Sequence, residues 1–509
     1  MAAFFLLCMS SLLLIVVSCY AVQLLKDARS HLPPGPWPLP VIGNVLQISR
    51  KLPHRSMACL AERYGPLMTV RLGTSLFVVA SSPSTAREIL QTHNASLSGR
   101  SPADAWSGAG HGANSVLVLP PRRKWRALRR LGTVRLFSPG RLEELRPLRQ
   151  QVARELLRDV SEAAASRSGG APASVQRAAF TAMVRLLWLA MFSEELSEAT
   201  TRGLHDSVRE AVDLVMTPNV SDFFPAVAAL DIQGVRRRMA TLIKRGYQLI
   251  DHQIYCRRHV REESRGGHAR SDDLLDVMLD MSEQDDDGGV TINRDVIRAF
   301  CTDLFIAASD TTSNTIEWAL AELLQNPETM RRLQEDIRAV LGSKPEVEDS
   351  DIERLPYLQA VIKETLRLHP AVPMLSYKAE ATVQVQGYTI PEGSNVVVNV
   401  WAIHHSADVW PEPFKFMPER FLMHKEIEYF GRNFELLPFG SGRHICLGLP
   451  LANRMLPVML GSLVHQFEWK LPDGARRSGV DMTEVWVSAV YGNPTQRHCE
   501  EDVSLASKN

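Results

Sequence analysis

Residues 438–448 read PFGSGRHICLG and place a single cysteine, Cys446, in a glycine-rich loop. An apolar stretch with helical spacing follows directly. Free N–H groups and the positive end of the helix dipole would therefore favour a metal-binding thiolate at Cys446. Gly440 and Gly442 allow positive φ and a close approach of the backbone to a flat cofactor. A lone cysteine is more often an inert, buried small hydrophobe, so the cysteine alone leaves both interpretations open.

The ten-residue pattern F-x-x-G-x-[RH]-x-C-x-G that begins at Phe439 resembles the haem-thiolate loop of the cytochrome P450 superfamily. The resemblance implies that Cys446 is the axial ligand of the haem iron. It also implies that Phe439 packs beside the sulfur and that Gly442 lets the backbone approach the haem. His444 occupies the position of an arginine in most members, where a histidine can still donate a hydrogen bond to a haem propionate. Leu447 replaces the proline that is usual in plant members.

The basic segment RRKWRALRR contains Trp125 and Arg129, which stand one helical turn apart on one face of a predicted helix. In the cytochrome P450 family, a W-x-x-x-R pattern at this place carries two side chains that reach a haem propionate. A solvated charged face or a membrane-surface patch is the alternative explanation for so many arginines. The resemblance implies that the other arginines face outward as a docking patch for an acidic electron donor.

A long predicted helix that begins near residue 293 has the unusual centre AASDTTSNT, residues 307–315. Asp310 and Thr311 match the acid–alcohol pair that relays protons to iron-bound oxygen in the family. Such a relay needs groups within hydrogen-bond reach of water at a helix distortion. Ala308, in place of the usual glycine, would make that distortion shallower. Alternatively, the threonines bond to preceding backbone carbonyls while an ion pair satisfies Asp310.

Glu364 and Arg367 form an E-x-x-R pattern in KETLRLHP, and Arg420 lies in PERF. Alone, the first pair would be a routine surface salt bridge. Together the three residues match the structural Glu–Arg–Arg triad that the family needs for haem incorporation. Tyr377 stands near a position where the family often has an arginine or histidine aimed at a propionate, and it cannot carry that charge.

Composition and the N-terminal segment further limit the possible functions and the location of the protein. Among the 509 residues, Lys+Arg and Asp+Glu both number 57, and this neutral balance argues against a general nucleic-acid binder. Seven scattered cysteines show no CxxC pair and no disulfide-framework spacing. Residues 2–25 carry no charge, and Lys26 and Arg29 follow. This pattern favours a retained transmembrane anchor over a cleaved signal peptide, with the rest of the chain in the cytosol.

The resemblance extends over about residues 30–490 and implies a mainly α fold with a smaller β part, the cytochrome P450 fold. We predict a single large haem domain behind an N-terminal transmembrane anchor. The predicted divisions are an anchor (1–25), a basic and proline-rich hinge (26–45), a haem-thiolate catalytic domain (46–490) and an atypical C-terminal tail (491–509). The final residues do not resemble the usual ending of the family, so the last substrate contact stays open.

The resemblance implies a haem-thiolate monooxygenase that binds haem b and hydroxylates a small hydrophobic substrate with O2. No dinucleotide fingerprint is present, so electrons are expected from an NADPH-cytochrome P450 reductase. The expected location is the endoplasmic reticulum membrane, in contact with membrane lipid. Among plant microsomal members, the chain is most similar to the terpenoid-oxidising group that includes geraniol hydroxylases, which predicts a terpenoid substrate.

Position within the family also suggests residues that line the substrate pocket, although each is equally consistent with ordinary core or surface. They are Trp106, Asn114, Val116, Phe300, Asp303, Leu304, Ala307, Met374 and Trp486. Two alternative functions remain at this point. One is a haem-thiolate isomerase or dehydratase that needs no reductase. The other is a catalytically impaired haem-binding relative, suggested by Ala308, His444, Tyr377 and the unusual C-terminal end.

Overall fold

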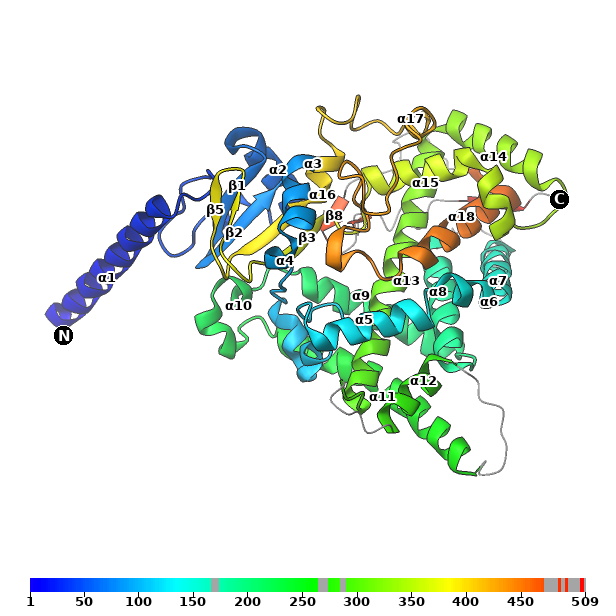
Figure 1. Cartoon of the computed structure of the whole chain (residues 1–509), viewed down its shortest axis with the longest axis horizontal. Helices are drawn as coiled ribbons and strands as arrows, with labels where there is room; N and C mark the ends of the chain where they lie inside the picture. Colours follow the sequence, from blue (N-terminus) through cyan, green and yellow to red (C-terminus); the bar gives the residue numbers. More distant parts are fainter. Residues whose placement is uncertain are drawn as a thin grey trace.

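The computed structural model describes residues 1–165, 174–263, 273–283, 290–470, 484–486, 490–492 and 504–507. Helices form most of the body, and a small sheet lies on the side nearest the N-terminal helix (Figure 1). The predicted mainly α fold with a smaller β part is therefore confirmed.

The helices within the described residues are α1 (Ala2–Arg29), α2 (Pro53–Tyr64), α3 (Pro83–Arg87), α4 (Asn94–Leu97), α5 (Arg123–Arg135), α6 (Pro139–Glu144), α7 (Arg146–Ala165), α8 (Val175–Phe192), α9 (Glu198–Met216), α10 (Val220–Phe223), α11 (Val235–Glu263), α12 (Leu274–Glu283), α13 (Arg294–Gln325), α14 (Pro327–Leu341), α15 (Pro356–Leu368), α16 (Val400–His404), α17 (Glu419–Met423) and α18 (Leu449–Gln466). Short 3-10 segments are η1 (Val45–Gln47), η3 (Asp104–Ala113), η4 (Pro225–Leu230), η5 (Asp349–Arg354) and η6 (Gly442–His444), and η2 (Glu88–Thr92) is π-helical.

The strands are β1 (Leu67–Leu72), β2 (Ser75–Ala80), β3 (Met374–Lys378), β4 (Val383–Val385), β5 (Tyr388–Ile390), β6 (Asn395–Asn399), β7 (Phe467–Lys470), β8 (Glu484–Trp486), β9 (Val490–Gly492) and β10 (Ser504–Ser507). The four-stranded sheet has the order β1-β2-β6-β3, with β2 and β6 parallel and the other pairs antiparallel. The valines of β6, in the sequence NVVVN, are buried, as expected for an inner strand.

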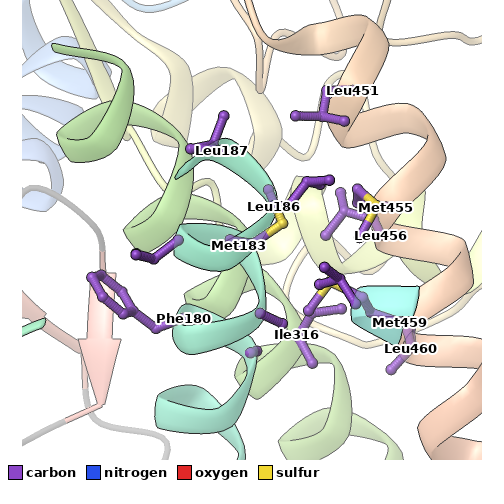
Figure 2. Close-up of a cluster of buried hydrophobic side chains, with 14 of the residues drawn as sticks. Phe180, Met183, Leu186, Leu187, Ile316, Leu451, Met455, Leu456, Met459 and Leu460 are labelled. Atoms are coloured by element: carbon purple, nitrogen blue, oxygen red, sulfur yellow. The ribbon is translucent and has the colours of Figure 1, made fainter. Parts of the chain in front are cut away.

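Helix α13 is the central element of the helical body and contacts α8, α11, α15 and α18. Buried side chains occur on all sides of it, which is typical of a helix enclosed by others. Figure 2 shows how α8 joins α13 to α18 through a cluster of aliphatic, methionine and phenylalanine side chains, namely Phe180, Met183, Leu186, Leu187, Ile316, Leu451, Met455, Leu456, Met459 and Leu460. The helix that follows the cysteine loop is thereby anchored to the central helix.

The N-terminal helix α1 projects away from the body (Figure 1). It continues to Arg29, four residues beyond the predicted end of the anchor, and Asp27 in its last turn forms an ion pair with Arg71 of β1 at 2.5 Å. The proline-rich segment that follows lies along β1, where the Thr69 N–H donates to the carbonyl of Pro34 at 2.8 Å. Over the described residues, the one helix found to be long and apolar enough to cross a membrane is α8, and 72% of it is buried as a core helix.

The C-terminal segment contains the antiparallel pair β8–β9. Residues 487–489, between these two strands in the sequence, lie outside the described residues. Trp486 is the last residue of β8, and its side chain also lies outside the described part of the chain. The strand β10, in the predicted tail, pairs with β7.

Candidate active site

The loop around Cys446 is closed by backbone hydrogen bonds. The N–H of Cys446 donates to the carbonyl of Phe439 at 2.9 Å, and the N–H groups of Gly448 and Leu449 bond to the Cys446 sulfur. Cys446 is exposed, yet the pKa of its thiol is raised, because desolvation by the surrounding protein outweighs these N–H groups and the positive charge of Arg129, which lower the pKa. The helix terminus therefore presents its donors to the sulfur in the way that stabilises a thiolate.

The two glycines of the loop adopt positive φ, with Gly440 at 69° and Gly442 at 67°. A Cβ on Gly442 would lie 2.3 Å from the carbonyl oxygen of Leu90 and 2.6 Å from the side-chain nitrogen of Asn94. A Cβ on Gly440 would make an ordinary 3.4 Å contact with Leu375. The need for glycine at 442 thus arises from close packing against the neighbouring π-helical turn as well as from its φ.

Two arginines meet beside the cysteine loop. Arg129 donates to the carbonyl of Ile445, and Arg100 donates from Nη1 to the carbonyl of Ser376 at 2.8 Å while its guanidinium lies 5.3 Å from the ring centre of Tyr377. Burial lowers the pKa of both arginines, and for Arg129 the charge of Arg100 adds to the effect. Neither forms an ion pair with any described residue, and the buried Nε of Arg100 has no hydrogen-bond partner there.

Arg100 was not identified from the sequence. The atom to which it donates belongs to a residue 276 positions away, and no local pattern signals the pairing. Holding two partly desolvated cations close together without a carboxylate costs free energy unless an anion binds to them. This cluster is therefore the part of the site best suited to hold the carboxylates of a cofactor.

His444 and Trp125 pack together next to these arginines. The Nε2 atom of His444 lies 2.7 Å from the carbonyl of Ser98, so Nε2 carries the proton. Burial and the charge of Arg100 lower the pKa of His444 to about 3, which leaves it neutral. The Trp125 ring meets it edge-on at 4.8 Å, and the indole N–H donates to the carbonyl of Val116 at 3.1 Å. Both N–H groups are thus bonded to backbone in this structure.

The centre of α13 remains α-helical through the acid–alcohol pair. The hydroxyl of Thr311 donates to the carbonyl of Ala307 at 2.9 Å, which is the back-bonding considered as an alternative for this motif. Asp310 is 2% exposed, whereas Ala307, Ala308 and Thr311 are half-buried. Ala308 packs against the large hydrophobic cluster of the helical body, as do Phe439 and Leu447 of the cysteine loop.

Gly132 of α5 explains how the loop accommodates Leu447. A Cβ on Gly132 would lie 2.8 Å from Leu447 Cδ2 and 3.2 Å from Phe300 Cζ. Because Gly132 has no side chain, there is space beside it for Leu447 to lie next to α13. Phe300 is fully buried at this junction, and the structure places it in the core between α5, α13 and the loop.

The Glu–Arg–Arg triad is assembled and buried. Glu364 accepts from Arg367 Nε at 2.7 Å and from Arg420 Nε at 3.0 Å, and it also accepts from the N–H of Met417 at 2.8 Å. Arg367 further donates to the carbonyl of His404 at 2.7 Å. The triad thereby joins α15 to the segment that leads into the cysteine loop. Within this buried charged group, each strong hydrogen-bond donor has an acceptor.

Asp303 ties the segment before α5 to the central helix. Its carboxylate receives hydrogen bonds from Ser115 Oγ at 2.9 Å and from the N–H of Val116 at 2.7 Å, and it lies 2.9 Å from His111 Nε2. Trp106 is buried and stacks on His111 with ring centres 5.5 Å apart. Asp303 and Val116 were predicted to line a pocket, and here they form a buried polar connection whose partners lie far away in sequence.

The other predicted pocket residues occupy three different environments. The side chain of Asn114 accepts a hydrogen bond from Lys124. Leu304 is buried in the same hydrophobic cluster as Phe300, and Ala307 on the same helix is half-buried. Met374 is half-buried at the first position of β3. A substrate contact for any of them stays a prediction.

Comparison with known proteins identifies the family to which the chain belongs. A family model for cytochrome P450 matches residues 33–494. The chain belongs to the cytochrome P450 family. It is 41% identical to geraniol 8-hydroxylase from Swertia mussotii, with 91% of this chain and 92% of that protein aligned. It is 42% identical to carnosic acid synthase from Rosmarinus officinalis, with 88% and 89% aligned. It is also 39% identical to Cytochrome P450 76C3 from Arabidopsis thaliana, with 90% and 89% aligned.

This protein is thus a cytochrome P450 monooxygenase of the plant group that its sequence pattern indicated. The family implies a haem cofactor, O2 and a reductase partner. The residues of this cytochrome P450 fit a haem on two observations of the structure. Cys446 presents a sulfur stabilised by two N–H groups, and the unpartnered Nε of Arg100 lies close to a second cation, Arg129.

Proposed function

We propose that this cytochrome P450 hydroxylates a small hydrophobic terpenoid, using haem b, O2 and electrons from an NADPH-cytochrome P450 reductase. The named activities of geraniol 8-hydroxylase and carnosic acid synthase support the substrate class. The cation pair Arg100–Arg129 beside Cys446 is the observation that carries the cofactor assignment. Its two guanidinium groups match the carboxylates of a propionate-bearing macrocycle.

Cys446 would hold the haem iron, and a thiolate-ligated haem supplies oxygen activation to the reaction. Arg100 and Arg129 would bind the propionates, because their donors face no carboxylate within the described residues. Trp125 and His444 would position Arg129 by packing, since the Arg129 guanidinium lies 5.4 Å from the centre of the Trp125 ring. Phe439 and Gly442 would shape the loop beside the sulfur.

Asp310 and Thr311 would move protons toward the oxygen-binding face of α13. The Thr311 hydroxyl bonds to the Ala307 carbonyl at 2.9 Å. Because the hydroxyl donates its hydrogen to that carbonyl, the lone pairs of the hydroxyl oxygen are able to accept a hydrogen bond from water. Ala308 leaves the helix regular here. We therefore propose that Thr311 holds water at this face and that Asp310 supplies the exchangeable proton.

We also propose that α1 anchors the protein in the endoplasmic reticulum membrane with the catalytic domain in the cytosol. The proline-rich segment after α1 exposes apolar side chains at Trp37 and Val41, and Leu46 of η1 is exposed just beyond it, which is characteristic of residues that contact lipid or another protein. On the outside of α5, Arg126 and Arg130 are exposed. They are suited to dock an acidic reductase by electrostatic complementarity.

The first test is the visible spectrum of the reduced protein with carbon monoxide. A red-shifted, thiolate-type Soret band that is lost in Cys446→Ser supports the ligand assignment. NADPH consumption and product formation are then measured with a reductase and a panel of terpenoids. Product formed without a reductase would favour the isomerase or dehydratase alternative. Haem binding without turnover on any terpenoid would favour the impaired relative.

A further inference from the structure

A cavity of about 520 Å³ lies between α9, α11, α13 and the C-terminal part of α8. Its walls are mainly aliphatic and aromatic, with Leu204, Val208, Leu242, Leu249 and Phe305 as the larger contributors. A volume of this size is typical of sites for small organic molecules, which are concave and mostly apolar with a few polar groups.

This cavity is separate from the haem face of α13. The helix contributes Thr302, Phe305 and Ile306 to it. Thr302 precedes Thr311 by nine residues, which is two and a half turns at 3.6 residues per turn, so the two side chains leave opposite sides of the helix. Among the residues whose side chains the structure describes, none of those predicted to line the substrate pocket borders this cavity.

Two residues at the inner end carry hydrogen-bond donors without a partner. Trp188 is 3% exposed and Thr302 is 7% exposed, and both line the cavity. The indole N–H of Trp188 and the hydroxyl of Thr302 are buried, and neither has a hydrogen-bond partner in the described part of the chain. Unsatisfied buried donors cost free energy that an acceptor from a ligand would recover.

The outer end of the cavity opens between α9 and α11. Gly203, Arg245 and Gln248 are exposed there, so a molecule can enter without crossing the helical core. Gly246 forms part of the wall, and a Cβ at this position would be 3.7 Å from the Thr302 hydroxyl oxygen. The lack of a side chain at Gly246 therefore keeps the space beside Thr302 open.

We propose that this cavity is a second binding site, behind α13, for a small apolar molecule that carries one hydrogen-bond acceptor oxygen. The hydrocarbon part lies against the aliphatic walls, and the oxygen accepts from Thr302 or Trp188. An uncharged alcohol or ketone of about ten to fifteen carbons matches this combination of volume and polarity. The site binds its ligand independently of the oxidation proposed above.

The test uses the haem-loaded protein saturated with 1-phenylimidazole, so that the haem face is occupied before the second ligand is added. Equilibrium dialysis then measures binding of geraniol, an acyclic alcohol, and of myrcene, a hydrocarbon with the same carbon skeleton. We expect close to one geraniol bound per protein. Gly246→Phe fills the cavity and removes this binding, while the matched control Gly246→Ala adds one methyl group and retains it.

Thr302→Val and Trp188→Phe keep the apolar shape but remove one donor each. We expect each to weaken geraniol binding by roughly 2- to 10-fold, the usual effect of one neutral hydrogen bond, and to leave myrcene binding unchanged. These two variants test the site independently if Gly246→Phe does not fold.

Absence of geraniol binding to the imidazole-saturated protein would overturn the site. Equal geraniol binding by Gly246→Phe and Gly246→Ala would overturn the assignment of the ligand to this cavity. Equal losses of geraniol and myrcene in Thr302→Val and Trp188→Phe would overturn the assigned acceptor contact. A protein that oxidises no terpenoid but passes these binding tests would contradict the proposed function alone.

Discussion

The Nε2 atom of His111 lies 2.9 Å from Oδ1 of Asp303, and both side chains are completely buried. The other ring nitrogen of His111 is 2.8 Å from the hydroxyl of Tyr247 on α11. One histidine therefore joins η3 to both α13 and α11. This connection holds the segment that precedes α5, and it gives Asp303 a structural role inside the region where a substrate contact was expected.

Asp303→Leu should lower the free energy of unfolding by about 3–5 kcal/mol, because it leaves His111 and the Val116 N–H without their buried acceptor. Chemical denaturation of the haem-loaded protein measures the change. Asp295→Asn is the matched control on the same helix, since the Asp295 side chain is 60% exposed and pairs with Arg298 at the surface. A loss as small as that of the control would show that the connection contributes little.

Gly442→Ala should destabilise the cysteine loop by about 2–4 kcal/mol, because the new Cβ adds a backbone clash to an unfavourable φ. The expected observation is reduced haem content and a lower midpoint of unfolding. Gly387→Ala is the control, because Gly387 has φ 82° and no atom within 4 Å of its Cβ position. Similar losses in the two variants would mean that φ alone, and not the contact with Leu90, decides the cost.

Glu364→Gln should lower the free energy of unfolding by about 3–5 kcal/mol, because it leaves Arg367 and Arg420 buried without their carboxylate. We expect little folded, haem-containing protein in the soluble or detergent-extracted fraction. Glu328 and Arg331 have the same i, i+3 spacing on the exposed surface of α14. Glu328→Gln should therefore change stability by no more than about 0.5 kcal/mol. Normal haem content in Glu364→Gln would contradict the importance of the triad.

Arg100→Ala should weaken haem retention, because it removes one of the two cations proposed to bind the propionates. Transfer of haem to apomyoglobin measures the dissociation rate, which we expect to rise by about 10-fold or more for one charge-assisted hydrogen bond. Arg126→Ala on the outer face of α5 is the control. An unchanged rate in Arg100→Ala would remove Arg100 from the cofactor site.

Asp222 should make stability depend on pH. Burial raises the pKa of its carboxyl to about 6 although the N–H of Asp104 bonds to it at 2.6 Å. The folded state then holds this proton between about pH 4 and pH 6 while the unfolded state releases it, so stability falls as the pH rises through this range. Asp222→Asn keeps an acceptor oxygen and removes the effect.

The Asp222→Asn variant should therefore be more stable than the parent protein by about 1–3 kcal/mol at pH 7 and nearly equal to it at pH 4. Denaturation midpoints at the two pH values give the comparison. Asp206→Asn provides a control at an exposed carboxyl on α9. If Asp222→Asn were more stable than the parent protein at pH 4 but not at pH 7, the raised pKa of Asp222 would be contradicted.

The sequence by itself determined the family, the cysteine loop and the members of the buried triad, because each is a short motif whose spacing is set by local backbone geometry. Cys446 stands before a helix, and Glu364 and Arg367 share one helix face whatever surrounds them. The acid–alcohol pair was visible for the same reason, and the back-bonded hydroxyl of Thr311 is the alternative that the sequence had left open.

Only the tertiary structure decided how distant residues meet. Arg100 bonds to a residue 276 positions away, and His111 meets Asp303 across 192 positions. It also decided that the N–H groups of His444 and Trp125 bond to backbone carbonyls and that a cavity lies behind α13. These features depend on the packing of whole helices and loops. That packing sets which polar groups are desolvated together, and no local spacing in the chain encodes it.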